Sequence, residues 1–371
     1  MRPRRLRVLH VVHRLDYGGL QRLVGAIVRR IDRDRFSSHV MTMSEFGALA
    51  EGLEAFAELH RVASIPHLSM VWPASAIRSI RSIAPDVVHS HSGVWYKASL
   101  AARGAGVPRL IHTDHGRHYP DPWTARTLDR LAARRTDVVV AVSEALARQL
   151  GETLVGDPTR IRVVVNGVDT CRFRPQAVNG TLRSELGVPP TAPIIGSVGR
   201  LDPIKAYDVM LQAFVLLRGQ WAQRPAPALV LVGDGPERAR LAALIEHYGL
   251  QGAAHLVGWR KDVEDLYAVF NVFTLSSRSE GTSLGLLEAM STGVCPVVTA
   301  VGGSPAVLGE RLRHRLVGPG DPEALAAAWR DAFAHPDRCE ADGAVARKRV
   351  EQAFGLDSMV RRYERLYAGE E

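Results

Sequence analysis

Cysteine is scarce in this chain of 371 residues: there are only 3, at positions 171, 295 and 339, with no Cys-x-x-Cys pair among them. This spacing supports neither a disulfide framework nor a cysteine zinc site, and it suits a reducing compartment. Long apolar runs are also missing, since none approaches the roughly eighteen residues of a membrane span. The basic opening of the chain has too short an apolar run for a signal peptide and is interpreted as a first strand. We therefore expect a cytoplasmic protein.

Low-complexity tracts are absent too, and 46% hydrophobic with 23% charged residues is a globular composition. The length exceeds one ordinary core and predicts two domains. The net charge of +8 is unevenly spread: residues 1–185 carry 27 Lys/Arg and 17 Asp/Glu, whereas residues 186–371 carry 20 and 22. A basic first half indicates an acidic partner surface, for which a membrane leaflet and a nucleic acid are both candidates.

Short apolar segments alternate with helical patterns in both halves, which predicts α/β architecture with two doubly wound parallel sheets. Strands are expected at 8–13, 39–43, 86–89, 110–113, 138–142, 161–165, 193–198, 229–232, 255–257, 272–275, 297–299 and 316–317. Helical patterns cover 20–31, 209–217, 238–248, 323–333 and 358–367. The turn-rich connector around 174–190 places the first domain at 1–178 and the second at 190–354.

The segment 277–290 follows the buried strand at 272–275 and leads into a short helix ending near Gly293. Thr282 or Ser283 can cap this helix, whose first free N–H groups and dipole favour an anion such as a phosphate. Glu280 precedes the helix and Glu288 lies inside it among apolar neighbours, where a carboxylate is costly to bury without a partner. The pattern predicts a phosphate cradle with a carboxylate on each side.

The tract EGTSLGLLEAM resembles the Glu-x7-Glu motif of retaining GT-B glycosyltransferases, in particular family 4. The resemblance implies a GT-B fold of two Rossmann-like domains facing a cleft, with a C-terminal helix, about 355–371, that packs back on the first domain. It assigns Glu280 to the donor sugar and Glu288 to the nucleotide ribose. The backbone of Thr282, Ser283, Leu284 and Gly285 would face the diphosphate.

Further segments match the same family. Tyr17-Gly18-Gly19 resembles the loop that closes on the donor diphosphate, although paired glycines are also typical of an ordinary tight turn. Gly199-Arg200-Leu201 with Lys205 follows the first strand of the second domain, where two cations suit a diphosphate. The family usually has Gly after this Lys, and here residue 206 is Ala.

Three more positions are carried over from the resemblance. Gly233 belongs to Val-Gly-Asp-Gly-Pro, which lacks the third glycine of a dinucleotide fingerprint and matches a turn at the cleft floor instead. Trp259 and Arg260 belong to the loop around the nucleobase. His115, followed by Gly116, is mapped to the histidine near the donor sugar, while His112 and Asp114 are alternatives that could equally be structural.

The resemblance implies a retaining hexosyltransferase that moves a sugar from a nucleotide diphosphate sugar to an acceptor hydroxyl. The catalytic candidates are Glu280, His115, Arg200 and Lys205. No Asp-x-Asp ends a strand, so we predict no catalytic metal, and the donor is a substrate rather than a cofactor. The opening HVVHRLDYGGL is typical of the subgroup that builds bacterial exopolysaccharide or other cell-surface glycans. The alternatives are a NAD-dependent oxidoreductase, which lacks its fingerprint after the first strand, and a basic nucleic-acid-binding protein, which lacks a binding motif.

The basic first half bears on where the protein works. Arg126, Arg130 and Arg134 recur every four residues in the predicted helix 123–135, beside Arg117, Tyr119, Trp123 and Arg135. An ordinary solvated arginine face explains this pattern as well as an anionic membrane does. The membrane interpretation predicts peripheral contact with the inner leaflet and a lipid-linked acceptor, with a sugar or another hydroxyl compound as the alternative, and no nucleic-acid partner.

Overall fold

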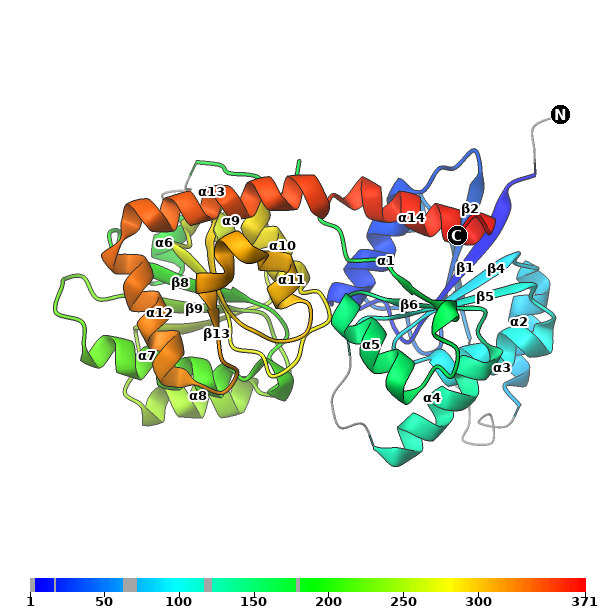
Figure 1. Cartoon of the computed structure of the whole chain (residues 1–371), viewed down its shortest axis with the longest axis horizontal. Helices are drawn as coiled ribbons and strands as arrows, with labels where there is room; N and C mark the ends of the chain where they lie inside the picture. Colours follow the sequence, from blue (N-terminus) through cyan, green and yellow to red (C-terminus); the bar gives the residue numbers. More distant parts are fainter. Residues whose placement is uncertain (1–3, 17, 63–71, 117–121, 178–180) are drawn as a thin grey trace. The chain divides into compact units, whose positions relative to one another are not determined.

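The computed structural model describes residues 4–16, 18–62, 72–116, 122–177 and 181–371. Contacts divide the chain into two compact units (Figure 1): unit 1 is Met1–Asn166 with Leu356–Glu371, and unit 2 is Gly167–Gly355. No helix in the described part of the chain combines the length and the apolar character that crossing a membrane requires.

Unit 1 contains a parallel sheet of 7 strands in the order β3-β2-β1-β4-β5-β6-β7. Its strands are β1 (Leu6–Val12), β2 (Phe36–Thr42), β3 (Glu58–Arg61), β4 (Val87–His91), β5 (Arg109–Asp114), β6 (Val138–Ala141) and β7 (Ile161–Val163). Its helices are α1 (Gly19–Arg30), α2 (Ala74–Ile83), α3 (Trp95–Ala105), α4 (Trp123–Arg135), α5 (Glu144–Thr153), a 3-10 turn at Pro158–Arg160 and α14 (Leu356–Ala368).

Unit 2 repeats the scheme with 6 parallel strands in the order β10-β9-β8-β11-β12-β13. The strands are β8 (Ile194–Val198), β9 (Ala228–Val232), β10 (Ala254–Gly258), β11 (Val272–Leu275), β12 (Cys295–Thr299) and β13 (Leu316–Val317). The helices are α6 (Leu182–Glu185), α7 (Tyr207–Gly219), α8 (Arg238–His247), α9 (Val263–Val269), α10 (Leu284–Ser291), α11 (Ser304–Leu308), α12 (Pro322–Ala334) and α13 (Pro336–Ala353), with 3-10 turns at Pro203–Lys205 and Glu310–Arg315.

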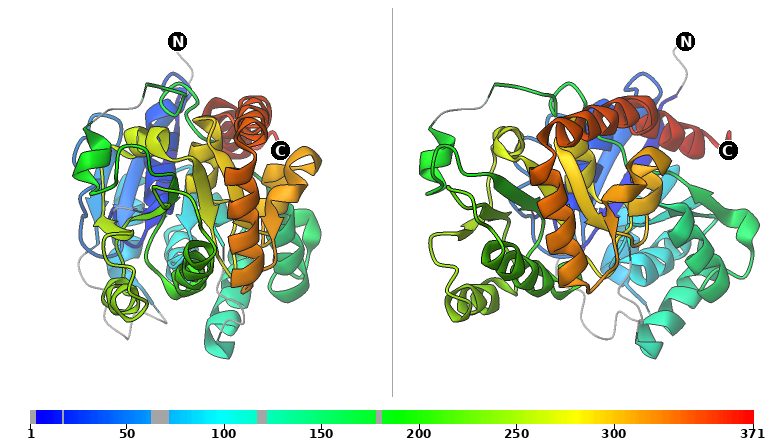
Figure 2. Two further views of the ribbon diagram at one scale, coloured as in Figure 1. Left: turned by 90° about the vertical axis from the view of Figure 1, so that its left-hand side faces the viewer. Right: turned by 60° about the vertical axis from the view of Figure 1, so that its left-hand side comes forward.

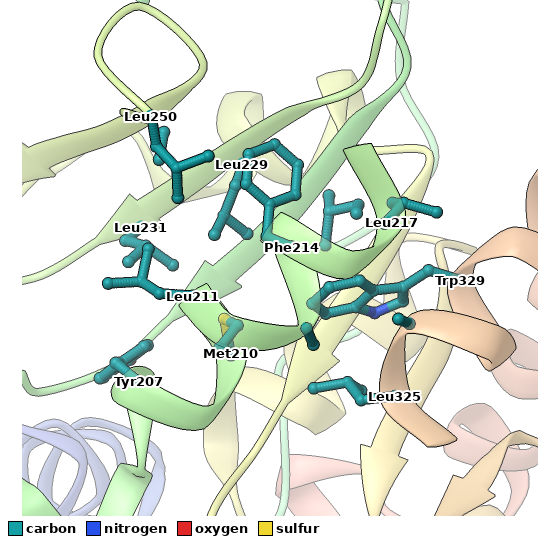
Figure 3. Packing of buried hydrophobic residues seen from close by; sticks show 14 of the residues in the cluster. Tyr207, Met210, Leu211, Phe214, Leu217, Leu229, Leu231, Leu250, Leu325 and Trp329 are labelled. Carbon is teal, nitrogen blue, oxygen red and sulfur yellow. The ribbon is translucent and has the colours of Figure 1, made fainter. Parts of the chain in front are cut away.

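The core of unit 2 lies where α7 and α12 pack side by side against its sheet (Figure 2). Phe214 of α7 lies over Leu229 of β9, and Met210, one turn earlier on α7, lies near Trp329 of α12; all four are fully buried (Figure 3). The indole N–H of Trp329 donates to Thr274 Oγ at 3.1 Å, so the large ring is buried without an orphaned donor. This packing holds the ends of β8 and β11 in place.

The last helix belongs to unit 1, where α14 packs beside α1 and β1 (Figure 1). Its Tyr367 hydroxyl lies 2.7 Å from His89 Nδ1, and its Tyr363 hydroxyl lies 3.2 Å from Thr113 Oγ. Glu364 accepts a hydrogen bond from the backbone N–H of Asp32 at 2.7 Å. Buried polar groups thus fix the helix to the sheet as well as apolar burial does.

The first segment of unit 1 ends at Asn166, whereas the connector composition predicts that the first domain ends at residue 178, which lies outside the described residues. Residues 167–177 are held by unit 2: the N–H of Val168 donates to Phe354 O at 2.9 Å, and Phe173 is 3% exposed. The polar, turn-rich composition of the connector predicts turns, but it does not predict that the core of unit 2 buries Phe173.

Several elements have no counterpart among those predicted from the sequence: the strand β3 and the helices α2, α3, α5, α6, α9, α11 and α13. The strand and the longest of these helices show why. β3 has four residues, Glu-Leu-His-Arg, with too little apolar alternation to indicate a strand. α13 is 18 residues long but buries only Asp342, Gly343, Ala346 and Val350, so its apolar stripe is narrow. The alternating parallel architecture itself is as predicted.

Candidate active site

The start of α10 meets the end of β8 in unit 2. Of the two caps that the sequence allows, Ser283 is the one used, and its Oγ accepts the N–H of Leu286 at 3.3 Å. A Cβ on Gly285 would lie 2.8 Å from Val198 O, so glycine lets the first turn approach the strand. The N–H groups of the first turn have no partner within the helix and therefore form a site of positive potential.

Glu280 lies directly before this helix and is fixed through its carboxylate. Lys205 Nζ donates to Glu280 Oε1 at 2.6 Å, and Ser277 Oγ donates to the same oxygen at 2.6 Å. The Glu280 side chain is 7% exposed and that of Lys205 is 21% exposed, so the pair is largely removed from water. An ammonium group has three donors, and the bond to Glu280 uses one of them. Lys205 can therefore orient the carboxylate and still bind an anion.

Glycine contacts set the backbone around this pair. Gly233 has φ +134° and packs so closely on the loop after β8 that a Cβ would lie 1.9 Å from Gly199 O. The Cε of Lys205 lies 4.0 Å from where a Cβ of Gly199 would be. Gly302 has φ +53°, and a Cβ there would lie 1.7 Å from Glu280 O. The structure therefore brings Gly199, Lys205, Gly233 and Glu280 together, with Gly302 behind the glutamate.

Glu288 lies one turn further along α10 and is 2% exposed. Its Oε2 accepts the hydroxyl proton of Tyr267 at 2.8 Å, and Tyr267 is itself fully buried. The Glu288 carboxylate, which the sequence places among apolar residues, thus has at least one hydrogen-bond partner, the hydroxyl of Tyr267. Tyr267 lies on α9 and fixes the orientation of the Glu288 carboxylate. This helix has no counterpart among the predicted helices.

The remaining predicted donor residues of unit 2 are less constrained. The Arg200 side chain is 70% exposed, and its Nε lies 3.8 Å from Asp202 Oδ2. Arg260 donates through Nε to Asp262 at 2.8 Å, a pairing that raises its pKa. Trp259 is 40% exposed. Arg260 is therefore held by a carboxylate, whereas the cation of Arg200 faces solvent.

The predicted residues of the first half lie in unit 1. Gly18 caps α1 with an extended backbone, and Gly19 is the first residue of that helix; Tyr17 lies outside the described residues. His115 follows β5, with its N–H donated to Ser92 Oγ at 2.9 Å. The alternative His112 stacks on Trp95 at a ring distance of 4.0 Å, and its Nδ1 lies 2.9 Å from Ser90 Oγ, as a structural group would.

Comparison with known families agrees with this arrangement. The family described as Glycosyltransferase Family 4 matches residues 17–172, and the one described as Glycosyl transferases group 1 matches residues 179–349. The chain belongs to glycosyltransferase family 4. The two matches correspond closely to the two sheets, so both halves of the family 4 chain carry the resemblance.

Two curated relatives are named D-inositol 3-phosphate glycosyltransferase. The one from Corynebacterium urealyticum is 30% identical over 268 residues, covering 67% of this chain and 62% of the relative. The one from Streptomyces scabiei is 30% identical over 298 residues, covering 74% of this chain and 65% of the relative. The family 4 chain thus spans less than two thirds of the length of these relatives.

Solved structures show the same fold. HepE of Anabaena in complex with UDP-glucose has a TM-score of 0.84 at 19% identity, covering 98% of this chain and 100% of that one. Sucrose-phosphate synthase from Thermosynechococcus elongatus has a TM-score of 0.79, also at 19% identity, covering 98% and 99%. The GT-B fold predicted from the sequence is confirmed.

In this family 4 chain the partly buried His115 ends a line of imidazoles whose other members, His91 and His10, are fully buried. Its Nε2 lies 3.1 Å from His91 Nδ1, and His91 Nε2 lies 3.3 Å from His10 Nδ1. His10 Nε2 is buried with no hydrogen-bond partner among the described residues. A neutral imidazole has one N–H, and a buried unpaired donor is rarer than a buried unpaired acceptor. The pattern therefore assigns the His10 proton to Nδ1, donated to His91, and the His91 proton to Nδ1, donated to His115. His115 then carries its own proton on Nδ1.

This line of histidines should make the protein sensitive to acid. Burial lowers the pKa of His10 and His115 to about 3, and it lowers the pKa of His89 and His91 well below the usual value. The unfolded chain binds protons near pH 6.5, so below that pH it holds more protons than the folded chain, and stability falls as the pH falls. Each histidine contributes up to about 1.4 kcal/mol per pH unit.

We expect the melting temperature to drop steeply between pH 6.5 and 5, which calorimetry can follow. The variant His10→Asn removes one of the titrating groups and should make the pH dependence shallower, whatever its effect at pH 7. A melting temperature that stays constant between pH 7 and pH 5 contradicts the assignment of neutral buried imidazoles.

Sequence reasoning gave no role to Tyr267, Ser277 or Gly302. Ser277 lies within the segment 277–290, and a hydroxyl three residues before the carboxylate of Glu280 could have indicated a local bond. Gly302 belongs to a Gly-Gly pair, which signals a turn but not its contact with Glu280. Tyr267 carries no local signal, because its partner is 21 residues away.

Proposed function

We propose that the chain is a retaining, metal-independent glycosyltransferase. It transfers a sugar from a nucleotide diphosphate sugar to an acceptor hydroxyl in bacterial polysaccharide or cell-surface glycan assembly. The observation that carries the proposal is the Lys205–Glu280 pair at the start of α10, with a contact of 2.6 Å. It places a carboxylate suited to sugar hydroxyls beside a cation and a helix N-terminus suited to phosphates.

The chemistry that these groups supply is electrostatic. As the bond between the sugar and the diphosphate breaks, negative charge grows on the leaving phosphate. Lys205, the exposed Arg200 and the N–H groups at the start of α10 stabilise that charge more in the transition state than in the ground state. In this proposal these groups take the part that a divalent cation plays in other transferases. Glu280 orients the sugar, and Glu288 holds the ribose.

The oxyanion that leaves can accept the proton of the acceptor hydroxyl on the same face of the sugar, which retains the anomeric configuration. The test is transfer from UDP-glucose, the ligand in the HepE structure, followed by NMR of the product. The proposal predicts an α-linked product from the α-linked donor. A β-linked product contradicts retention, and full activity only when Mg2+ is supplied contradicts metal independence.

The two glutamates should separate by role. Glu288→Ala is expected to weaken binding of the free nucleoside diphosphate by about tenfold, since a hydrogen bond to a charged group contributes about 1.5–3 kcal/mol. Glu280→Ala should spare that binding and impair sugar transfer. Calorimetric titration with UDP and an initial-rate assay measure the two effects. Glu310→Ala, whose side chain is 87% exposed, is the control. Equal loss of UDP binding in both variants contradicts the assignment.

The basic face of unit 1 supports a proposal for the acceptor. α4 begins at Trp123, which is 77% exposed, and Arg130 and Arg134 are exposed on the same helix while Arg126 is partly buried. Arg117 and Tyr119 lie outside the described residues. Each basic residue near an anionic leaflet contributes about 1 kcal/mol. This face supports peripheral attachment to the inner leaflet and a lipid-linked acceptor. The alternative is a small phosphorylated polyol, because the curated relatives are named for D-inositol 3-phosphate.

We therefore expect the protein to co-sediment with anionic liposomes at low salt and to be released at high salt. Replacing Arg126, Arg130 and Arg134 with Ser should abolish co-sedimentation and leave donor binding intact. The matched control replaces Arg313, Arg330 and Arg338, exposed arginines of unit 2, with Ser. If the wild type ignores anionic liposomes at low ionic strength, the arginines are a solvated face and the acceptor is the soluble compound.

A further inference from the structure

The edge of the unit 1 sheet carries a cluster of metal-ligating side chains away from the donor residues. β3 is the terminal strand and pairs in parallel with β2, with His39 opposite Glu58 and Met41 opposite His60. Because side chains alternate along a strand, His39, Glu58 and His60 share one face of the two strands. Two imidazoles and a carboxylate on one face form a ligand set that suits Zn2+.

The distances agree with a metal centre. His39 Nδ1 lies 3.1 Å from His60 Nε2 and 3.5 Å from Glu58 Oε2, and one ligand atom from each of the three side chains lies within 4.8 Å of the others. Tetrahedral Zn2+ with bonds of about 2.0–2.1 Å separates its ligand atoms by about 3.3–3.4 Å. The two observed separations lie on either side of that value, so small rotations of the side chains would complete the geometry.

The three groups are also available to an ion. Among the described residues their side-chain hydrogen bonds and ion pairs connect only these three groups to one another. The His39 side chain is 9% exposed and fixed, whereas that of Glu58 is 75% exposed, so an ion can enter from solvent. A fourth position is then left for water.

A second cluster of histidines, His10, His89 and His91, has only one ring nitrogen without a partner among the described residues, His10 Nε2. Both nitrogens of His89 are engaged at 2.7 Å, with Tyr367 and with Thr113. Both nitrogens of His91 take part in the line that leads to His115. A metal at that place would have to break several of these bonds in the core, whereas the edge cluster would lose one hydrogen bond, between His39 and His60 at 3.1 Å.

We propose that His39, Glu58 and His60 bind one Zn2+ ion, which ties the edge strand β3 to β2. The ion cross-links two strands that otherwise share only a short ladder, and binding to the folded state alone stabilises unit 1. The cluster contains none of the residues assigned to donor binding or transfer, and the proposal gives the ion a structural role in unit 1.

The test uses the full chain, stripped of metal with a chelator and titrated with Zn2+ by calorimetry and by thermal unfolding. We expect one Zn2+ ion per chain and a rise in melting temperature on binding. His60→Gln and Glu58→Gln should each weaken binding by about tenfold or more. Both positions lie on an edge strand, so the variants should fold, and circular dichroism checks this. Co2+ in place of Zn2+ should give the visible absorption of a tetrahedral site, which His60→Gln should lose.

His314→Gln is the matched control, because His314 also contacts a carboxylate, Asp342 at 2.8 Å, but belongs to unit 2. It should bind Zn2+ like the wild type. The proposal is overturned if the wild type binds no Zn2+, or if His60→Gln and Glu58→Gln bind it with unchanged affinity. Binding that is lost in His89→Gln but kept in His60→Gln also overturns it and moves the site to the buried cluster.

Discussion

Replacing Lys205 with alanine is expected to lower turnover by more than about tenfold and to destabilise unit 2 as well. A charge-assisted contact to the donor diphosphate contributes about 1.5–3 kcal/mol, which is the source of the rate loss. Removing the ammonium also leaves Glu280, 7% exposed, with no cation at 2.6 Å. Losing one partner of a buried pair costs more than the pair itself contributes, because the remaining charge stays poorly solvated. Initial rates and thermal unfolding measure the two effects.

The variant Arg200→Ala separates the loss of donor binding from the loss of stability. Its side chain is 70% exposed and 3.8 Å from its carboxylate, so the substitution should weaken donor binding without changing the melting temperature. The double variant Lys205→Met, Glu280→Gln should recover much of the stability lost in Lys205→Met, because it leaves no unpaired charge, yet it should remain inactive. Unchanged diphosphate affinity in both Lys205→Ala and Arg200→Ala would remove these cations from the site.

The variant Gly302→Ala should cost several kcal/mol of stability and also impair transfer. Its φ of +53° alone costs a residue with a Cβ about 1–2 kcal/mol. A Cβ would also lie 1.7 Å from Glu280 O, so the backbone of the glutamate must move. A shift of the carboxylate from its bonds with Lys205 and Ser277 then disturbs the site, where small displacements have large effects on rate.

Gly320→Ala is the control for this variant, because Gly320 also has a positive φ, +74°, but nothing lies within 4 Å of its Cβ position. It should lose only the conformational part of the stability and keep its activity. If the two variants have equal melting temperatures and equal rates, the contact between residue 302 and Glu280 has no role in holding the site.

Local signals in the sequence predicted much of the backbone geometry around α10. An apolar strand, a hydroxyl cap and a short helix define the start of α10, and the glutamates at 280 and 288 follow from the same segment. Lys205 was predicted near the diphosphate, but its bond to Glu280 was not. The two residues are 75 positions apart, and only the order of β8 and β11 in the sheet brings them together.

The parts that were missed have a common physical origin. β3 is polar because it lies at the edge of the sheet. Without this strand the sequence does not reveal that His39 is paired with Glu58 or that His60 lies beside them. The partner of Glu288, Tyr267, is contributed by a helix of 7 residues, too short for a clear periodic pattern.

Ala206, where the family usually has Gly, adopts φ +49°, so the backbone keeps the glycine-like conformation despite the methyl group.

The most direct test of the central claim is a calorimetric titration of the wild-type chain with UDP, GDP, ADP and TDP, each with its sugar, and with NAD. The account predicts that one nucleoside diphosphate binds at a single site and that the corresponding nucleotide sugar competes with it for that site. Lys205→Ala should weaken the binding of both compounds by more than about tenfold. Binding of NAD, or binding of no nucleotide at all, would contradict the account of Lys205, Glu280 and the start of α10 as a nucleotide-sugar site.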